Sequence, residues 1–336
     1  MLLEARELKM IYPSVGASRF NLLHRRSDGV RAVDGVSLSL IKGETLGLVG
    51  ESGSGKSTLG WCMVGLHQPT AGHVLFRGRP VTSDVGDRRH LQLIFQDPYS
   101  SLNPRMKIGD CLTELIRVHK LAQGVAIKAR ALELLSLVGL SSAHYDAYPR
   151  HLSGGQRQRA SIARALALEP EVIVADEPVS ALDVSIQATI VALLDHLKDE
   201  LGLTLLFITH NLGVVRHVAD RVAVMYAGRI VELAPTAELF GNPRHPYTRG
   251  LIDAVPRIDR RRHRTSVMGD PPSPRWLPSG CRFHPRCPHA FDLCSEADPP
   301  LSRGPSGDDH VAACHLAWPA PLGISQRSDD LSKERP

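Results

Sequence analysis

The fold of this chain is decided by residues 45–58, which read Thr45-Leu-Gly-Leu-Val-Gly50-Glu-Ser-Gly-Ser-Gly-Lys56-Ser57-Thr58. The first five residues form the short apolar run of a buried strand, and a helix is expected to begin near Lys56. The segment between them matches the pattern G-x-x-x-x-G-K-[ST]. A glycine-rich turn could match this pattern by accident, but here the strand and helix stand where the pattern needs them. We therefore predict a phosphate-binding loop.

Each part of this loop has a chemical task. Glycines let the backbone wrap so that successive N–H groups face phosphate oxygens, and the helix N-terminus adds a favourable dipole. Lys56 can reach the β- and γ-phosphates, and Ser57 can ligate Mg²⁺. The predicted nucleotide contacts in the loop are Gly50, Glu51, Ser52, Gly53, Ser54, Gly55, Lys56, Ser57 and Thr58.

Two acidic residues end a second apolar strand, Val172-Ile-Val-Ala-Asp176-Glu177. Ligands bind at the carboxyl edge of a parallel sheet, where such residues lie. We predict that Asp176 holds Mg²⁺ through its hydration shell and that Glu177 polarises the attacking water. A capped loop is the alternative for two acids after a strand, but the phosphate-binding loop in the same chain favours catalysis.

A second anion site is predicted at the four residues Ser153, Gly154, Gly155 and Gln156, which precede an evident helix at 157–168. A hydroxyl and two glycines at a helix N-terminus favour an anion. One chain hardly needs two γ-phosphate sites for a single nucleotide. The economical explanation is that this segment serves the nucleotide bound by another subunit.

The chain changes character at about residue 240. Before it, short apolar runs such as 93–95 and 205–209 alternate with helix-like stretches, which predicts a mostly parallel sheet covered on both faces. A helix ending at Gly202 and a hairpin turning at Ala227-Gly228 are also expected. Beyond it, prolines and arginines become frequent. We expect a nucleotide-binding domain at 1–240, an extension at 241–318 and a disordered tail at 319–336.

Together these motifs resemble the ATP-binding subunits of ABC transporters, over essentially residues 1–320. The resemblance includes Gln96 after Leu93-Ile-Phe95, the signature Leu152 to Gln156, the D-loop Ser180-Ala-Leu-Asp183, and His210 after Leu206-Phe-Ile-Thr209. It implies an α/β fold: a P-loop NTPase (RecA-like) core with antiparallel β and α-helical subdomains, the latter at about 97–157. It also implies a head-to-tail dimer with two ATPs between the phosphate loop of one subunit and the signature of the other.

The resemblance assigns roles to particular residues. His210 would sense the γ-phosphate and hold the water and Glu177, while Gln96 would contact Mg²⁺ and the nucleophile and report to the membrane domain. The implied catalytic residues are Glu177, His210, Gln96 and Lys56; Ser57, Gln96 and Asp176 hold Mg²⁺; Gln96 and Asp183 join the ATP contacts. Tyr12 is the aromatic residue expected to stack on the adenine base, and Phe20 is the other candidate. The structural alternative for Tyr12 is ordinary packing at the end of a strand.

Two C-terminal segments narrow the resemblance. Asn242-Pro-Arg-His-Pro-Tyr-Thr248 and Cys281-Arg-Phe-His-Pro-Arg-Cys287-Pro are similar to the extension of oligopeptide and dipeptide importer ATPases, nearer the second, "F"-type subunit. That subgroup implies a second ATPase subunit, usually a paralogue, two membrane permeases and an extracytoplasmic solute-binding protein, and no nucleic acid. Permease contacts would come from the helical segment, with Tyr99, Leu102 and Met106 as candidates that could equally be local core. The cargo stays open, because nickel, glutathione and opine importers share the subgroup.

Two other functions were weighed. A soluble ABC ATPase acting on nucleic acid or ribosomes usually carries two cassettes or a long coiled coil, but only 56 residues separate Gln96 from Ser153. A regulatory subunit that binds ATP without hydrolysing it is disfavoured by the retained Glu177 and His210.

Composition sets the remaining limits. Hydrophobic residues make up 43% and charged residues 22%, as in soluble globular proteins, and no apolar run reaches the 18 residues of a membrane span. Four charged residues among the first ten argue against a signal peptide. A net charge of +5 permits an anionic partner without choosing one. We expect a cytosolic chain, peripheral on the cytoplasmic face of the inner membrane.

Four of the six cysteines, Cys281, Cys287, Cys294 and Cys314, follow the spacing C-x₅-C-x₆-C-x₁₉-C in a proline-rich segment. Such a segment lacks a core to offset its ordering entropy, so a bound metal is expected to fold it. Sulfur ligation narrows the choice to zinc or an iron–sulfur cluster. Zinc remains an alternative because one of four nearby histidines could replace a cysteine as a ligand: His284, His289, His310 or His315. The alternative without any metal is four independent free thiols. Similarity to the peptide importers favours a [4Fe–4S] cluster.

Overall fold

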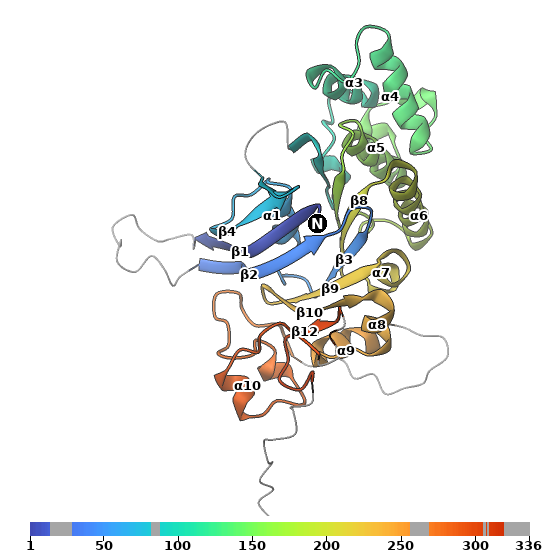
Figure 1. Ribbon diagram of the computed structural model, residues 1–336. Coiled ribbons are helices and arrows are strands. Elements are labelled where there is room, and N and C mark those ends of the chain that lie inside the picture. The colour runs from blue at the N-terminus through green and yellow to red at the C-terminus, as the bar shows by residue number, and fades with distance from the viewer. Residues whose placement is uncertain (14–28, 82–87, 256–268, 305–306, 308, 319–336) are drawn as a thin grey trace, which may run out of the picture.

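A computed structural model describes residues 1–13, 29–81, 88–255, 269–304, 307 and 309–318. Its main sheet has the strand order β11-β12-β10-β9-β3-β8-β7-β6 (Figure 1). Five of these strands are parallel: β6 (Leu91–Ile94), β7 (Val172–Asp176), β8 (Thr204–Thr209), β3 (Thr45–Val49) and β9 (Arg221–Tyr226). The mostly parallel sheet predicted from the alternating pattern is confirmed.

A second sheet is antiparallel throughout, with the order β2-β1-β4-β5. It consists of β1 (Leu3–Pro13), β2 (Gly29–Leu40), β4 (Ala71–Phe76) and β5 (Arg79–Pro80). Helix α1 (Lys56–Met63) packs against strands of both sheets, and its Leu59 and Met63 are fully buried between them. One hydrophobic core therefore joins the two sheets through the helix that follows the phosphate-binding loop.

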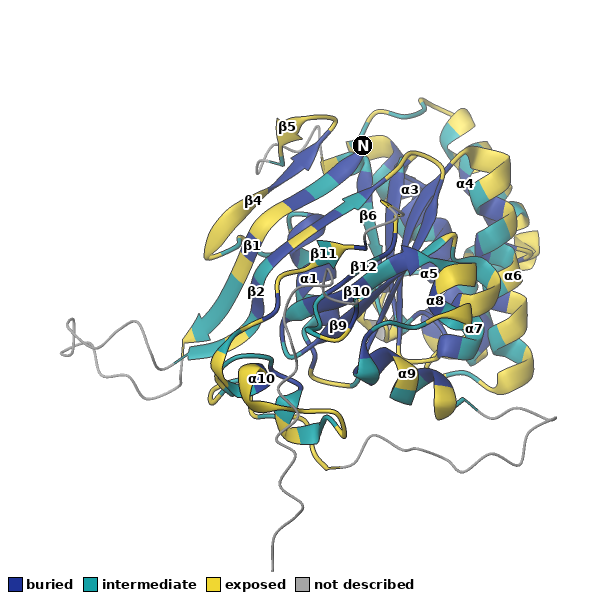
Figure 2. Ribbon diagram, turned by 60° about the horizontal axis from the view of Figure 1, so that its bottom comes forward, coloured by how far each residue is buried: buried dark blue, intermediate teal, exposed yellow. Residues whose placement is uncertain are grey.

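The other face of the main sheet carries the second core (Figure 2). Its central strands β3, β7 and β8 are buried along their whole length because helices or the second sheet cover both faces. The covering helices are α5 (Gly154–Leu166), α6 (Val184–Leu201), α7 (Leu212–Val218), α8 (Thr236–Gly241) and α9 (Pro246–Asp253). Helix α6 ends at Gly202 with φ +65°, as predicted.

Helices α3 (Ile108–Val118) and α4 (Ala126–Leu137) pack on each other at the end of the molecule farthest from the C-terminal segment (Figure 1). Leu102, proposed from the sequence as either a permease contact or core, belongs to the core, because only 3% of its surface is exposed. It is therefore not a docking residue. Met106 is half-buried, and the side chain of Tyr99 lies outside what the structure describes.

The C-terminal segment continues the main sheet. Strand β10 (Arg229–Pro235) forms the predicted hairpin with β9, and β12 (Val311–Ala312) pairs with β10 and with β11 (Ser302–Arg303). Helix α10 (Asp292–Glu296) lies in the loops outside this edge. Phe20 and the predicted tail 319–336 fall outside the described residues. No helix in the described ranges is long and apolar enough to cross a membrane.

Candidate active site

The phosphate-binding loop requires glycine at its two ends. Gly50 has φ +155° and Gly55 has φ +104°. A Cβ at Gly50 would lie 2.2 Å from the Met225 carbonyl oxygen, and one at Gly55 would lie 2.0 Å from that of Ala32. The loop is thus pressed between β2 and β9, and only glycine permits both the dihedral angles and the close backbone approach.

Lys56 is buried and bonded inside this loop. Its ammonium donates to the carbonyl oxygens of Gly50 at 2.8 Å and Glu51 at 2.9 Å. Burial lowers the pKa of the Lys56 ammonium, and the carboxylates of Glu177, Asp176 and Glu51 act in the opposite direction. The arrangement holds a desolvated cation where the phosphates of a nucleotide are expected.

The predicted Mg²⁺ ligands Ser57 and Asp176 meet across the floor of the site. The Ser57 hydroxyl donates to Asp176 Oδ1 at 2.8 Å. Burial raises the pKa of Asp176, the Ser57 hydrogen bond lowers it, and the neighbouring Glu177 carboxylate raises it further. The buried Asp176 carboxylate, with a hydroxyl and the partly exposed Glu177 carboxylate beside it, suits a hard cation such as the Mg²⁺ of a magnesium–nucleotide substrate.

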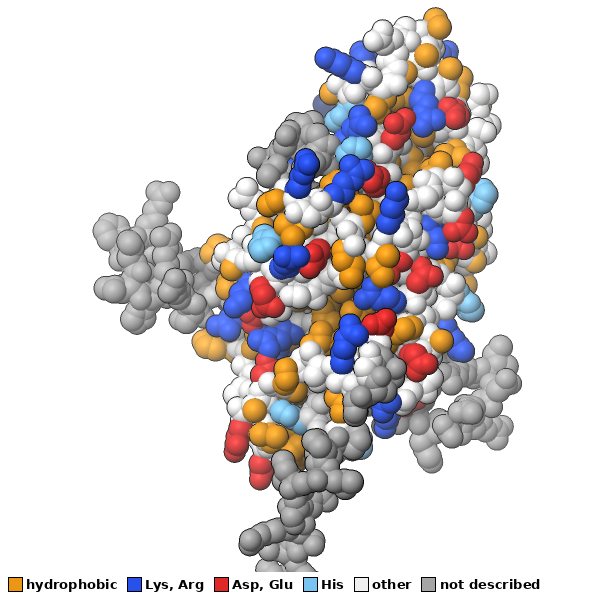
Figure 3. All heavy atoms as spheres, viewed as in Figure 1, with side chains coloured by type: hydrophobic (Ala, Val, Ile, Leu, Met, Phe, Trp, Pro, Cys, Tyr) orange, Lys and Arg blue, Asp and Glu red, His pale blue; other side chains and the backbone are white. Residues whose placement is uncertain are grey.

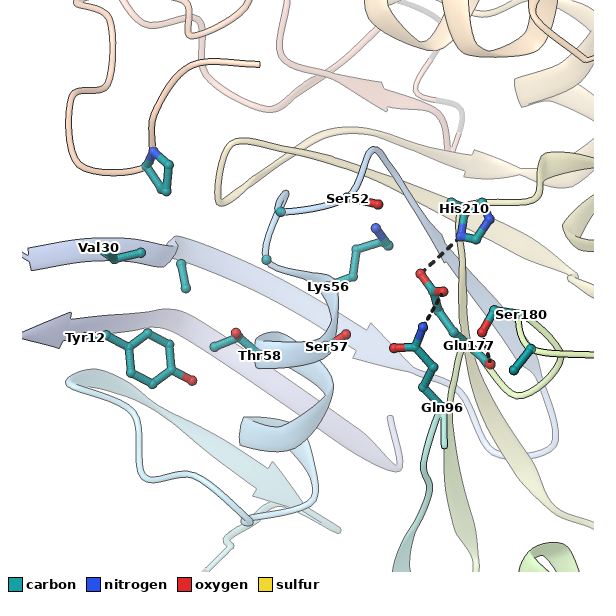
Figure 4. A pocket seen from close by; sticks show the side chains of 15 residues that line it. Tyr12, Val30, Ser52, Lys56, Ser57, Thr58, Gln96, Glu177, Ser180 and His210 are labelled. Carbon is teal, nitrogen blue, oxygen red and sulfur yellow. Dashed lines mark hydrogen bonds and ion pairs between the residues drawn. The ribbon is translucent and has the colours of Figure 1, made fainter. Parts of the chain in front are cut away.

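Glu177 lies between two polar side chains (Figure 4). Gln96 Nε2 donates to its Oε2 at 3.3 Å, and His210 Nδ1 lies 3.2 Å from its Oε1. Gln96 follows β6, Glu177 follows β7 and His210 follows β8, so three neighbouring parallel strands bring them together. A carboxylate held in this way can accept a proton from water, as a general base must.

These residues line one cavity of about 740 Å³. Of the predicted site residues it contains Tyr12, Ser52, Gly53, Gly55, Lys56, Ser57, Thr58, Gln96, Glu177 and His210. Tyr12 lies at the end of the cavity opposite Glu177 (Figure 4). Its hydroxyl is 2.9 Å from His67 Nδ1. Gly50, Glu51 and Ser54 do not line the cavity; they form the back of the loop.

The sequence-based prediction missed five lining residues: Val30, Ala32, Ser180, Ala181 and Pro274. Val30 and Ala32 alternate along β2, and Ser180 and Ala181 stand in the quoted D-loop, so a pattern was available for these four. Nothing near Pro274 in the sequence marks it. It reaches the cavity from the C-terminal segment, where its carbonyl oxygen accepts a hydrogen bond from Arg31 N at 3.1 Å.

The second predicted anion site is a well-formed helix N-terminus apart from this cavity. Ser153 caps α5, and its Oγ accepts from Gln156 N at 3.3 Å while Gln156 Oε1 accepts from Ser153 N at 2.9 Å. Asp183 precedes α6, with its carbonyl oxygen accepting from Ile186 N and Gln187 N. None of Ser153, Gly154, Gly155, Gln156 and Asp183 lines the cavity within the chain.

The four C-terminal cysteines are neighbours without forming a ligand set. Burial, with smaller contributions from the other three cysteines, raises the pKa of the Cys314 thiol to about 11. Burial likewise raises the pKa of Cys281 and of Cys287. Within the described ranges, however, no group of three or more His, Cys, Asp or Glu is arranged to hold a metal ion. The arrangement of the thiols in the described residues therefore does not form the metal site that the sequence predicted.

A phosphate-binding loop, a cation position and a carboxylate aimed between them define a site that hydrolyses nucleoside triphosphates. Comparisons with known proteins narrow this class. The family model "ABC transporter" matches residues 33–180, and the model "Oligopeptide/dipeptide transporter, C-terminal region" matches residues 231–294.

Whole-chain relatives agree with these matches. The oligopeptide transport ATP-binding protein AppF of Bacillus subtilis is 46% identical over 94% of this chain and 97% of its own length. The dipeptide transport ATP-binding protein DppF of Haemophilus influenzae is 44% identical over the same shares. A dimeric, post-hydrolysis structure of the ATP-binding cassette MJ0796 with ADP and Pi matches 70% of this chain and 99% of its own, with 29% identity and a TM-score of 0.60. The chain belongs to the ATP-binding subunits of ABC transporters, and it is an ATPase.

Proposed function

We propose that this chain is one of two ATP-binding subunits of an ABC importer and that its ATP hydrolysis powers the uptake of peptides or related small solutes. The observation that carries the ATPase part is the Glu177 carboxylate, placed by Gln96 and His210 in the same cavity as Lys56 and Ser57. The peptide cargo is supported by the names of the relatives AppF and DppF and by the matching C-terminal region.

The proposed roles follow from charge and position. Lys56 and the loop N–H groups bind the phosphates, and Ser57 and Asp176 hold the Mg²⁺ of the substrate, which neutralises charge on the transferred phosphoryl group. Glu177 accepts the proton of the attacking water, while His210 and Gln96 fix the direction of its carboxylate. Tyr12, at the far end of the cavity, packs against the adenine base.

The signature segment is proposed to complete the site of a partner subunit. Its helix N-terminus is shaped for an anion yet lies outside the chain's own cavity, which supports a head-to-tail dimer. The similar ATP-binding cassette MJ0796 was solved as a dimer. The further proposed partners are a paralogous ATPase, two membrane permeases and an extracytoplasmic binding protein, with the chain peripheral on the cytoplasmic face of the membrane.

We propose the domain organisation 1–240 and 241–318. The supporting feature is the composition change near residue 240, and β12 and β11 of the extension pair with the sheet edge at β10, so the two parts share one sheet. On the face shown in Figure 3, basic and acidic side chains are interspersed, which favours a transporter subunit over a nucleic-acid-binding ATPase.

The decisive experiment is Glu177→Gln in the assembled transporter. Loss of the base should reduce phosphate release by roughly 100- to 10,000-fold and abolish uptake of a labelled peptide, while MgATP binding is retained. Unchanged turnover would remove Glu177 from its role. If the parent transporter hydrolyses ATP normally but takes up nickel, glutathione or an opine and not peptide, only the proposed cargo is refuted.

A second proposal concerns Cys281, Cys287, Cys294 and Cys314, which we propose hold an iron–sulfur cluster, with zinc as the alternative. It is supported by the closeness of the thiols, because Cys281, Cys287 and Cys294 all act electrostatically to raise the pKa of Cys314, and Cys287 and Cys294 act in the same way on Cys281. Anaerobically purified chain should absorb near 400 nm and contain about four irons. Cysteine-to-serine variants should lose both the absorbance and the iron. A single bound zinc would replace the cluster assignment with a zinc site. Metal-free protein with an ordered extension would refute the cluster and the zinc site alike.

A further inference from the structure

Glu51, the second residue of the phosphate loop, turns its side chain away from the cavity and towards the C-terminal extension. Its carboxylate accepts two hydrogen bonds from the Arg286 guanidinium, from Nη1 to Oε2 at 2.8 Å and from Nη2 to Oε1 at 3.0 Å. The Arg286 side chain is only 7% exposed and also donates to the Tyr226 hydroxyl at 3.2 Å. This two-point pair joins positions separated by 235 residues in the sequence.

The backbone of Glu51 is held as firmly as its side chain. Its N–H donates to the hydroxyl of Tyr247 at 2.8 Å, and Tyr247 is a fully buried residue of α9. Its carbonyl oxygen accepts from the Lys56 ammonium. It also accepts from Ser54 N at 3.2 Å. Every polar group of this loop residue is therefore engaged, and residues beyond position 240 hold both its side chain and its N–H.

The negative charge of Glu51 would disfavour nucleotide binding if Arg286 did not neutralise it. A carboxylate in a loop that must bind three phosphates repels the substrate and competes for Lys56, because the interior screens charges poorly. Arg286 neutralises that carboxylate from the side opposite the cavity. Burial acts to lower the pKa of the Arg286 guanidinium, but the bonds to Glu51 and Tyr226 outweigh it and raise the pKa, so the cation is permanent.

The extension meets the loop at further points. A cavity of about 200 Å³ behind the loop is lined by residues 51–54 and by Pro271, Pro272, Ser273 and Pro274. Pro274 also lines the nucleotide cavity itself. The same C-terminal segment thus reaches both the back of the phosphate loop and the wall of the cavity.

We propose that Arg286 is a positioning residue and counter-ion of the phosphate loop, so that the C-terminal extension is a working part of this chain's own ATP site. The proposal rests on the proposed function, because it assumes that the cavity binds MgATP. According to this proposal, the extension increases the affinity of the site for the nucleotide. An ion pair that only stabilised the fold would not change this affinity.

The test measures dissociation constants of the full-length chain for MgATP, MgADP and adenosine. Arg286→Ala should weaken MgATP binding by about tenfold, the cost of losing charged hydrogen bonds, and affect adenosine little, because the uncompensated Glu51 charge acts on phosphates. Adding Glu51→Gln to Arg286→Ala should restore most of the affinity, because the repelling charge is then gone. Arg286→Lys, which keeps the charge but not the two-point geometry, should bind MgATP better than Arg286→Ala.

The matched control is Arg303→Ala, which removes an exposed pair with Asp309 in the same extension and should leave all three constants unchanged. Equal affinities in Arg286→Ala and the parent overturn the proposal, as does a double variant no tighter than Arg286→Ala. If Arg286→Ala does not fold, Arg286→Lys and the double variant decide. A parent chain that binds no MgATP, or binds it undiminished after Lys56→Ala, refutes the proposed function itself.

Discussion

The role of Glu177 depends on its backbone conformation as well as on its carboxylate. Its backbone lies at φ +46°, a region that non-glycine residues rarely occupy and that surrounding contacts must enforce. Its N–H donates to the Ile208 carbonyl oxygen at 2.9 Å, and its own carbonyl oxygen accepts from Ser180 N at 3.2 Å. The turn after β7 therefore directs the carboxylate into the cavity before any nucleotide binds.

His245 is the residue whose titration should be visible in stability. It is fully buried at the N-terminus of α9, where its Nδ1 accepts the Tyr247 N–H at 3.0 Å, and burial lowers its pKa from 6.5 to about 4. The neighbouring acidic group is Glu232, which is paired with His310. Because the unfolded chain binds a proton in this range and the folded chain does not, stability is present above pH 6.5 and is lost as pH falls towards 4.

We expect this loss to reach about 2 kcal/mol between pH 7 and pH 5. It is measured by urea unfolding at both pH values. His245→Asn, whose side-chain oxygen can still accept the Tyr247 N–H, is the comparison: its stability should fall less over the same interval. Equal pH dependence in the two proteins would show that other groups are responsible.

At the scale of elements, the N-terminus of α5 tests the dimer. Ser153 caps this helix, so any replacement loses a cap worth about 1 kcal/mol. Ser153→Arg should, in addition, fill the anion site and lower turnover by at least about 100-fold, because it blocks charge stabilisation of the partner's phosphates.

Ser153→Ala separates the two effects, because it removes the cap without filling the site. Affinity for MgATP should stay near the parent value in both variants, since the phosphate loop of the same chain is untouched. If Ser153→Arg abolishes nucleotide binding by the monomer, the signature acts within its own chain and the proposed sandwich is wrong.

At the scale of the whole molecule, the cavity reaches solvent beside the catalytic carboxylate. His210 is 55% exposed although it contacts Glu177, and no signature residue lines the cavity. We expect ATPase activity per subunit to rise with protein concentration, measured by phosphate release over a dilution series with and without the paralogous subunit. Constant activity per subunit down to the lowest concentration would contradict the need for a dimer.

The amino-acid sequence determined the core of this protein because its signals are local. A phosphate loop needs closely spaced glycines followed by Lys56, and a helix cap needs Ser153 three positions before Gln156. The alternation of buried strands and helices likewise predicted the parallel sheet that places Gln96, Glu177 and His210 after adjacent strands.

Tertiary structure alone decided what depends on distant segments. From the sequence Leu102 could be core or surface, and the fold placed it in the same buried cluster as residues of α3, α4 and α5. The distant partners of Glu51 come from α9 and from the 3-10 helix His284–Arg286, and Pro274 enters the cavity from the same extension. No spacing or periodicity encodes such pairs, because side-chain burial and charge are satisfied by whichever segments the completed fold brings together.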